Sequence, residues 1–459
     1  LISRSLMSRV GSRTEAPEEE ILPEEIVRKT TDFEHSQMKN GRVLFRVIAG
    51  SSTMTTGGDN VLERVSLWRF DDDGQPSDMI EGEEAVYNPA RKKILFTGDV
   101  VIRLERGILI YADRVEGNLA SETLVIREDY RMEHESVIGQ GRGLEYVFLL
   151  HRLRFLDRVN LEMDAVADRK EVEAGRGEYL MDSGRIVLED RVRIESPQST
   201  VRGDRVEALL DSNGQLSILR SWGRARLSAG GSGSFSGDEL SLDLRNGLLT
   251  VLSSDAGTKS LFQAGGELGS RRISGDAIYC SFTSAPGDSW TLKKIKADGG
   301  VKLEFPESSL KDCRGEHFQG ELSSGSDMHF ETISLSGNVH LVQEDAPGSK
   351  GILEGQDLRL ELDREGLPEL VVASGEVSAD LSRPAGPEKG MENYRIEAGD
   401  VLRLVYDHGT VREAVARRDC RLAVRTGEQS DRLEADSLRI EFLNGLMAGA
   451  SAGGKVRGR

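Results

Sequence analysis

Residues that could perform catalysis or bind metal ions lie scattered along this sequence. Cys313 and His317 have a spacing found in metal-ligand pairs, but one such pair on a strand pattern is usually structural. The Asp-Asp-Asp-Gly stretch at 71–74 resembles part of a calcium loop, lacks the later glutamate, and lies where a hairpin turn is expected. The glycine-rich stretch 139–143 resembles part of a nucleotide loop, but the apolar run 144–150 follows it instead of a helix, which predicts a turn or kink. HExxH, GxSxG and P-loop motifs are absent, so we expect no enzyme, cofactor or metal.

The composition favours a thin β structure. Hydrophobic residues make up 37% of the 459 residues, and 51 glycines stand against 11 prolines, a balance typical of many tight turns. The net charge of −18 argues against nucleic acid as a partner. Three distant cysteines, Cys280, Cys313 and Cys420, do not form a disulfide framework and leave the compartment open.

Alternation of apolar and polar residues begins near Arg42 and predicts β-strands. In the stretch 98–105, Val100, Ile102 and Leu104 point one way while Arg103 and Glu105 point the other. Similar stretches begin at 157, 190, 299 and 337.

A second signature lies between these stretches, with Gly-Asp or Ala-Asp followed by apolar residues two, four and six positions on. It occurs at 112, 203, 237, 275, 399 and 435. We expect the glycine to let a strand kink without a Cβ clash. Asn-Gly and Asp-His-Gly turns at 213, 246, 407 and 444 close the units and favour antiparallel hairpins.

The units recur every roughly 30 to 43 residues, a period that marks stacked repeats. We therefore predict an all-β, elongated antiparallel β-jellyroll that is kinked into a V-shaped trough. Residues 1–40 are expected to be a flexible polar segment with one short helix near 24–29, and 447–459 a flexible tail.

The ordered recurrence of these motifs resembles the lipopolysaccharide-export proteins of the periplasm, the LptC/LptA group with the OstA-like β-jellyroll. Residues 41–164 resemble the inner-membrane-associated member, with its pattern visible in 62–67, 77–87 and 98–104. Residues 165–446 resemble stacked copies of the bridge protein's repeat, most clearly at 201–206 and 335–341. The chain is about twice the family's usual length, and residues 1–40 contain no apolar run long enough to be that member's N-terminal transmembrane helix.

The resemblance implies a periplasmic scaffold that binds the acyl chains of lipopolysaccharide and passes lipid from an inner-membrane ABC exporter toward the outer membrane. A segment upstream of residue 1 would tether it to the inner membrane. The alternate apolar residues would line the trough: Val100, Ile102, Val159, Leu161, Val192, Ile194, Val206, Leu240, Leu242, Val301, Leu303, Val339, Leu341, Leu402 and Leu404.

Three alternatives stay open from the residues alone. The same apolar side chains would also fill a closed core. The repeats would also suit a structural or adhesive surface protein, and a β-helix would suit a polysaccharide-processing enzyme. Asn-Gly turns favour antiparallel hairpins over a β-helix, and the aspartates recur at kinks instead of clustering in one groove.

Assembly through strand edges is a further expectation, because an open stack leaves unpaired backbone groups at its ends. We predict that strand 433–443 pairs with a homologous bridge protein or a second copy, and that 42–48 docks to the exporter.

Overall fold

A computed structural model of the protein describes residues 26–134, 137–165, 168–197, 199–212, 214–229, 233–252, 259–264, 271–284, 290–305, 309–323, 329–344, 349–384, 391–427, 429–443 and 446–458. Within them the predicted all-β, antiparallel fold is confirmed, and every described pair of strands is antiparallel. One 3-10 helix, η1 (Phe148–Leu150), interrupts the strands of the described residues. None of these residues forms a helix long and apolar enough to span a bilayer.

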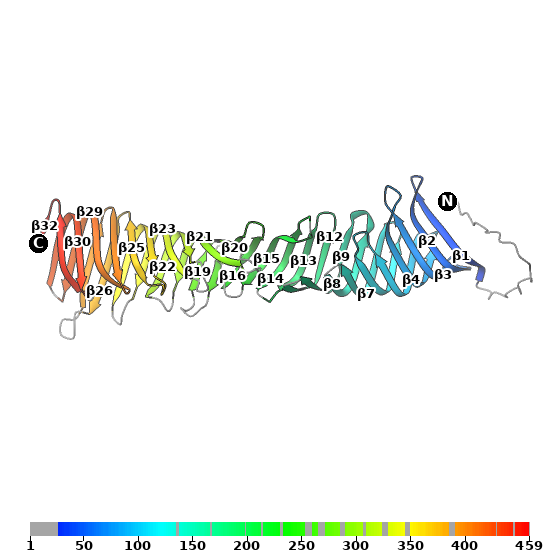
Figure 1. Ribbon diagram of the computed structural model, residues 1–459, viewed down its shortest axis with the longest axis horizontal. Coiled ribbons are helices and arrows are strands. Elements are labelled where there is room, and N and C mark those ends of the chain that lie inside the picture. The colour runs from blue at the N-terminus through cyan, green and yellow to red at the C-terminus, as the bar shows by residue number, and fades with distance from the viewer. Residues whose placement is uncertain are drawn as a thin grey trace, which may run out of the picture. The chain divides into compact units, whose positions relative to one another are not determined.

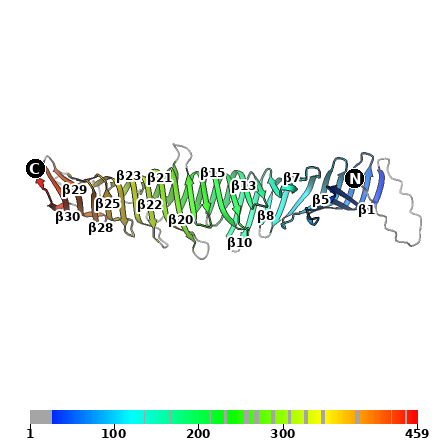
Figure 2. The same ribbon diagram turned by 90° about the horizontal axis from the view of Figure 1, so that it is seen from above.

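The chain divides into two compact units. The first comprises 1–197 and 204–215, and the second comprises 198–203 and 216–459. This division lies further along the chain than the predicted boundary between 164 and 165. In each unit most strands pair with their neighbours in sequence, as Figures 1 and 2 show.

The strands of the first unit are β1 (Ile26–Lys39), β2 (Arg42–Thr55), β3 (Asn60–Phe70), β4 (Pro76–Asn88), β5 (Lys93–Arg103), β6 (Leu109–Asn118), β7 (Thr123–His134), β8 (Val137–Val147), β9 (Arg152–Phe155), β10 (Val159–Ala165), β11 (Asp168–Ala174), β12 (Arg176–Leu180) and β13 (Arg185–Glu195). Strand β14 (Ser199–Leu210) contributes to both units.

The strands of the second unit are β15 (Leu216–Ala229), β16 (Gly233–Asp243), β17 (Leu248–Leu252), β18 (Ser260–Ala264), β19 (Arg271–Gly275), β20 (Ala277–Ser284), β21 (Trp290–Glu304), β22 (Leu310–Leu322), β23 (Phe330–Gln343), β24 (Lys350–Leu362), β25 (Pro368–Ser374), β26 (Val377–Pro384), β27 (Met391–Ala398), β28 (Val401–Asp407), β29 (Thr410–Thr426), β30 (Gln429–Leu443), β31 (Leu446–Gly453) and β32 (Arg457–Gly458).

The long strands are bent, so that each unit consists of two walls. In the second unit, β16 pairs with β17 through 239–243 and with β18 through 234–236. Strand β17 then pairs with β20, β18 pairs with β19, and both β19 and β20 pair with β21. The long strand β16 thus spans both walls, whereas each of its short partners, β17 and β18, belongs to one wall. We call the line where the walls join the crease, and the opposite border, where their outer ends meet, the rim.

Register shifts in the middle of the strands form the crease. At one of them, Gly337 and Asn338 have φ values of 79° and 51°, in the left-handed region that glycine and asparagine tolerate best. On the paired strand β22, a Cβ on Gly315 would lie 3.1 Å from the Ser336 carbonyl oxygen. The crease therefore needs a left-handed bulge on one strand and a closely approached glycine on its neighbour.

The glycines of the second signature, which begins at 203, 237, 275 and 399, were predicted to kink the strands. The structure gives Gly275 and Gly399 a different role. Neither Gly275 nor Gly399 has a positive φ; instead, a Cβ on them would lie 3.0 Å and 3.2 Å from backbone carbonyl oxygens of Asp298 and Arg418. The left-handed residues belong to the other signature, which begins Gly98-Asp99 or Gly337-Asn338.

The prediction that both ends of the chain are flexible is wrong for the part of them that the structure describes. Residues 26–39 form β1, which pairs with β2 along its whole length, in place of the predicted short helix. Residues 446–453 and 457–458 form β31 and β32, which both pair with β30. In both cases a neighbouring strand offers backbone hydrogen bonds, and these outweigh a polar or glycine-rich local composition.

The prediction that 433–443 and 42–48 lie at the edges of the stack was also wrong. Strand β30 contains 433–443 and lies between β29 on one side and β31 and β32 on the other. Strand β2 contains 42–48 and lies between β1 and β3. Among the described residues, the outermost strands are therefore β1 in the first unit and β31 with β32 in the second.

Candidate ligand-binding interior

Apolar side chains project inward from both walls in continuous rows. In the second unit, one row crosses β16, β17 and β20, and the other crosses β16, β18 and β19. The members of both rows are 0–1% exposed: Leu240, Val251 and Ile278 in the first, and Phe235, Phe262 and Ile273 in the second.

The residues predicted to line the trough lie inside the fold, with two partly exposed. Those that are buried are Val100, Ile102, Val159, Leu161, Val192, Val206, Leu240, Val301, Leu303, Val339, Leu341, Leu402 and Leu404. Ile194 and Leu242 keep part of their surface in contact with solvent. The alternation therefore identified buried positions well, and burial alone does not distinguish a lipid groove from a closed core.

Contacts between the walls close the rim of the second unit. The rings of Phe305 and Phe330, from the ends of opposite walls, have centroids 6.5 Å apart. Nearer the C-terminus, the Tyr394 ring meets Phe442 at 5.6 Å, and its hydroxyl accepts a hydrogen bond of 3.1 Å from the Met447 amide.

A polar bridge joins the same two walls. The Tyr406 hydroxyl donates to Gln343 Oε1 at 2.8 Å, and Gln343 Nε2 donates to the Gly409 carbonyl at 3.0 Å. The walls of the second unit therefore touch along several strands.

The rim of the first unit is closed by charged as well as aromatic groups. Lys39 at the end of β1 reaches Glu122 between β6 and β7, with Nζ and Oε1 2.7 Å apart. Phe45 and Phe148 pack edge to face at 5.6 Å. Farther along, Arg106 donates to the Met181 carbonyl and pairs with a neighbouring aspartate.

A buried ion pair is the most unusual feature of this rim. The inward row of β3 runs Val65, Leu67, Arg69, and that of β4 runs Ile80, Asp78, so both apolar rows end in a charge. The side chains of Arg69 and Asp78 are 9% and 1% exposed, and Nη1 lies 3.4 Å from Oδ2.

The neighbours of this pair come from both walls. The Glu105 amide donates to Asp78 Oδ1 at 2.9 Å, and the Arg69 guanidinium lies 5.6 Å from the centre of the Phe148 ring. Burial raises the pKa of Asp78 despite the lowering effects of that hydrogen bond and of Arg69. Burial also raises the pKa of Tyr146, with the nearby Asp78 adding to the effect.

Sequence reasoning missed this pair, although a signal was present. Arg69 and Asp78 each occupy the next inward position of a row that is otherwise apolar. A charge in that register is costly unless it is paired or functional, so it could have been singled out.

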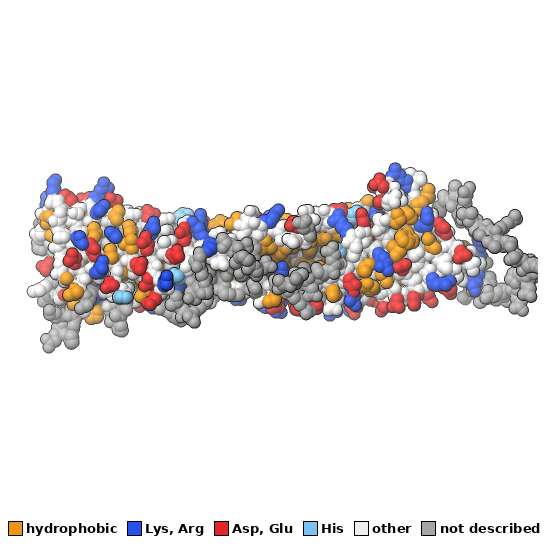
Figure 3. Space-filling view, viewed as in Figure 1, with side chains coloured by type: hydrophobic (Ala, Val, Ile, Leu, Met, Phe, Trp, Pro, Cys, Tyr) orange, Lys and Arg blue, Asp and Glu red, His pale blue; other side chains and the backbone are white. Residues whose placement is uncertain are grey.

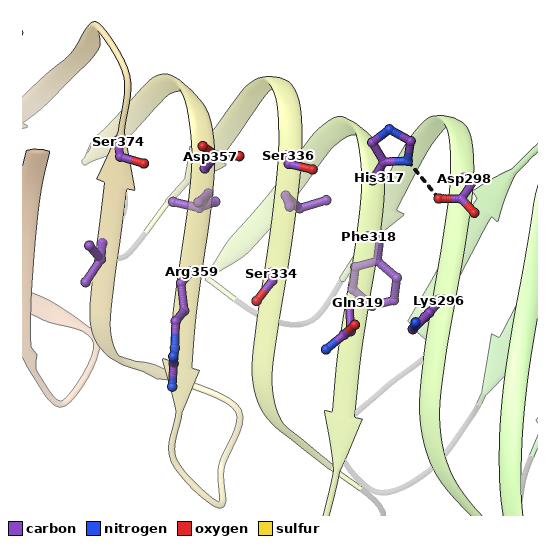
Figure 4. A pocket seen from close by; sticks show the side chains of 13 residues that line it. Lys296, Asp298, His317, Phe318, Gln319, Ser334, Ser336, Asp357, Arg359 and Ser374 are labelled. Carbon is purple, nitrogen blue, oxygen red and sulfur yellow. Dashed lines mark hydrogen bonds and ion pairs between the residues drawn. The ribbon is translucent and has the colours of Figure 1, made fainter. Parts of the chain in front are cut away.

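A groove of about 500 Å³, lined by both polar and apolar residues, lies on the outer surface of the second unit over β21 to β25. Figure 4 shows its two rows of side chains, with Lys296, Gln319, Ser334 and Arg359 in one. The other row contains Asp298, His317, Ser336, Asp357 and Ser374, with His317 Nδ1 2.7 Å from Asp298 Oδ1. Phe318, Leu335 and Leu358, which are buried, also contribute to its lining.

The other candidate sites from the sequence are structural in the described residues. Cys313 is buried whereas the His317 side chain is 65% exposed, so the two do not face a common ion. Residues 71–75 form the expected hairpin turn, in which the Gly74 amide donates to the Asp71 carbonyl at 3.1 Å. Residues 139–143 lie within β8, where Gly143 has a φ of 70°. No group of three or more metal-ligating side chains occurs in the part of the chain that the structure describes.

Comparison of the sequence with known protein families finds no matching family, and comparison with curated proteins finds no matching relative.

The outer surface carries charges of both signs. Figure 3 shows basic and acidic side chains interspersed, and many form cross-strand pairs, such as Arg439 with Glu413 and Arg154 with Glu145, both at 2.8 Å. Each unit thus combines a charged exterior with an apolar interior. Such an arrangement can shield hydrocarbon from water once the walls separate.

Proposed function

We propose that this protein binds the acyl chains of an amphipathic lipid, lipopolysaccharide in the first instance, between its two walls and carries it through the periplasm. The observation that carries the proposal is the repetition of inward apolar rows on both walls, strand after strand in each unit. Each methylene group transferred from water into such an interior contributes about 0.8 kcal/mol, so binding requires no catalytic group. The similarity of the repeats to those of lipopolysaccharide-export proteins also supports it.

The proposal includes partners at both ends of the chain. An inner-membrane ABC exporter would supply the lipid, and a homologous bridge protein or a second copy would receive it toward the outer membrane. Strands β1 and β31 pair on only one side among the described residues, so they are the edges that would accept a partner strand.

Site-specific photo-crosslinking tests the binding site. A photoreactive residue at Leu303, which points inward, should capture lipopolysaccharide, whereas one at Lys302, whose side chain is 42% exposed, should not. Leu242 and Ser241 provide a second inward and outward pair, at a place where the inward side chain is partly exposed to solvent. Equal capture at the inward and outward positions of both pairs would refute the proposal.

A structural or adhesive surface protein is the second candidate. The observation that favours it is the closed rim, because ring and hydrogen-bond contacts join the walls and nearly all predicted lining residues are buried. Mass spectrometry of lipid that copurifies with the protein distinguishes the two functions. A protein that carries no lipid from a lipopolysaccharide-containing host, and captures none in the crosslinking test, fits the second candidate.

A further inference from the structure

We propose that Arg69 is the anchor for an anionic group, a phosphate or carboxylate, on an amphiphile whose hydrocarbon enters the first unit. This inference rests on the proposed function and specifies the head group that the site selects.

The position of Arg69 suits this role. It continues the inward apolar row of β3 at the rim, directly after Leu67, which is fully buried. A ligand whose chain follows the row would therefore place its polar end beside the guanidinium. Phe148 lies against the guanidinium from the opposite wall and also packs against Tyr146 at 4.9 Å. These rings would shield the ionic contact from water, which strengthens it.

The hydrogen-bonding capacity of Arg69 is only partly used. Nη1 donates to Ser77 Oγ at 3.0 Å and to Asp78 Oδ2 at 3.4 Å. Nε is buried and has no hydrogen-bond partner within the described ranges. A guanidinium binds phosphate or carboxylate best through two parallel N–H groups, and its contact with Asp78 is a single long one.

Asp78 is suited to give way to a ligand. Its other oxygen already accepts the Glu105 amide, which holds the carboxyl in place without Arg69. Because burial favours the protonated carboxyl, Asp78 can take up a proton when an external anion pairs with Arg69. The buried site would then contain one cation and one anion, as it does without ligand. Tyr146, His151 and Glu105 are the other titratable groups that interact with Asp78.

The test compares two probes that differ only in the phosphate, 1-lauroylglycerol-3-phosphate and 1-lauroylglycerol, below their critical micelle concentrations. The full chain should bind the phosphate-bearing probe about tenfold more tightly, as expected for a hydrogen-bonded charge pair. Arg69→Gln should abolish that preference, and Arg69→Lys should retain part of it. Arg103→Gln removes a charge from the exposed pair with Glu81 and should leave the preference unchanged.

The ratio of the two affinities is the readout, because a variant that only loosens the fold weakens both probes alike. Equal binding of the probes by the unmodified protein, or an unchanged ratio in Arg69→Gln, would overturn the inference and leave the proposed function standing. Failure of both probes to bind would count against the proposed function itself. Inorganic phosphate alone should bind far more weakly than the phosphate-bearing probe. Comparable binding would indicate a site for a free anion and would overturn the inference that the ligand is an amphiphile.

Discussion

The substitution Leu303→Ala distinguishes a packed interior from an open groove. Leu303 is 0% exposed, and it lies in the row of β21 that pairs with Ile273 and Cys313 on the neighbouring strands. The substitution removes three carbon atoms. At about 0.8 kcal/mol for each group, with an added cost for the cavity that remains, the loss is about 3 kcal/mol.

The expected effect is large enough to measure by thermal unfolding in the absence of lipid. For a unit of this size, about 3 kcal/mol lowers Tm by roughly 6–12 °C. The control Lys302→Ala removes an exposed neighbouring side chain, and its effect should stay within about 0.5 kcal/mol. A fall in Tm no larger than that of the control would show that Leu303 faces solvent, and would refute the assignment of this row to a packed interior.

A bound amphiphile should partly restore the Tm of the Leu303→Ala variant. A short-chain amphiphile that occupies the space left by Leu303→Ala replaces lost contacts, so it should raise the Tm of the variant more than that of the unmodified protein. The same shift in both proteins would mean that the ligand binds elsewhere.

Three further predictions follow from the crease and the buried groups. Gly315→Val should lower stability by about 1–3 kcal/mol because its Cβ would lie 3.1 Å from the Ser336 carbonyl oxygen, whereas Gly449→Val, with nothing within 4 Å of its Cβ, should be tolerated in chemical denaturation. Burial raises the pKa of the Cys280 and Cys313 thiols, so both should resist a thiol reagent until guanidinium unfolds the protein; rapid labelling of the native protein would contradict their placement. Burial also raises the pKa of Tyr87 to about 12, so its contribution to stability should be present below about pH 10 and decline as the pH rises to about 12; a Tyr87→Phe variant should lose less stability over that range.

The fold was largely predictable because alternation reports which side of a strand is buried. Val301 and Leu303 are buried, as the alternation predicted, since a strand exposed on one side repeats every second residue. The ends of the chain were harder, because β31 depends on the backbone of β30 and not on its own side chains. The kink was assigned to the wrong one of the two signatures for a related reason. Close approach of a carbonyl to Gly275 is a property of the paired strand, which no local pattern contains.

The candidate site was less predictable than the fold. Phe148 follows β8 and lies in a short 3-10 helix, yet it contacts Phe45, which is about a hundred residues earlier in the sequence. The Arg69–Asp78 pair lies on two consecutive strands, but its burial depends on the opposite wall. Sequence periodicity predicts the rows of each wall, and it does not predict how the walls meet at the rim.

A closed rim is compatible with lipid binding if cargo can replace the contacts that close it. In the second unit those contacts include aromatic pairs, worth about 0.5–1.5 kcal/mol each, and hydrogen bonds worth about 1 kcal/mol each. A single chain of twelve carbons, moved from water into the interior, contributes roughly 9 kcal/mol. The side chains of the two walls would exchange contacts with each other for contacts with hydrocarbon, which are of similar strength. One acyl chain therefore offsets the loss of several rim contacts, and the walls can stay closed without cargo and separate when it enters.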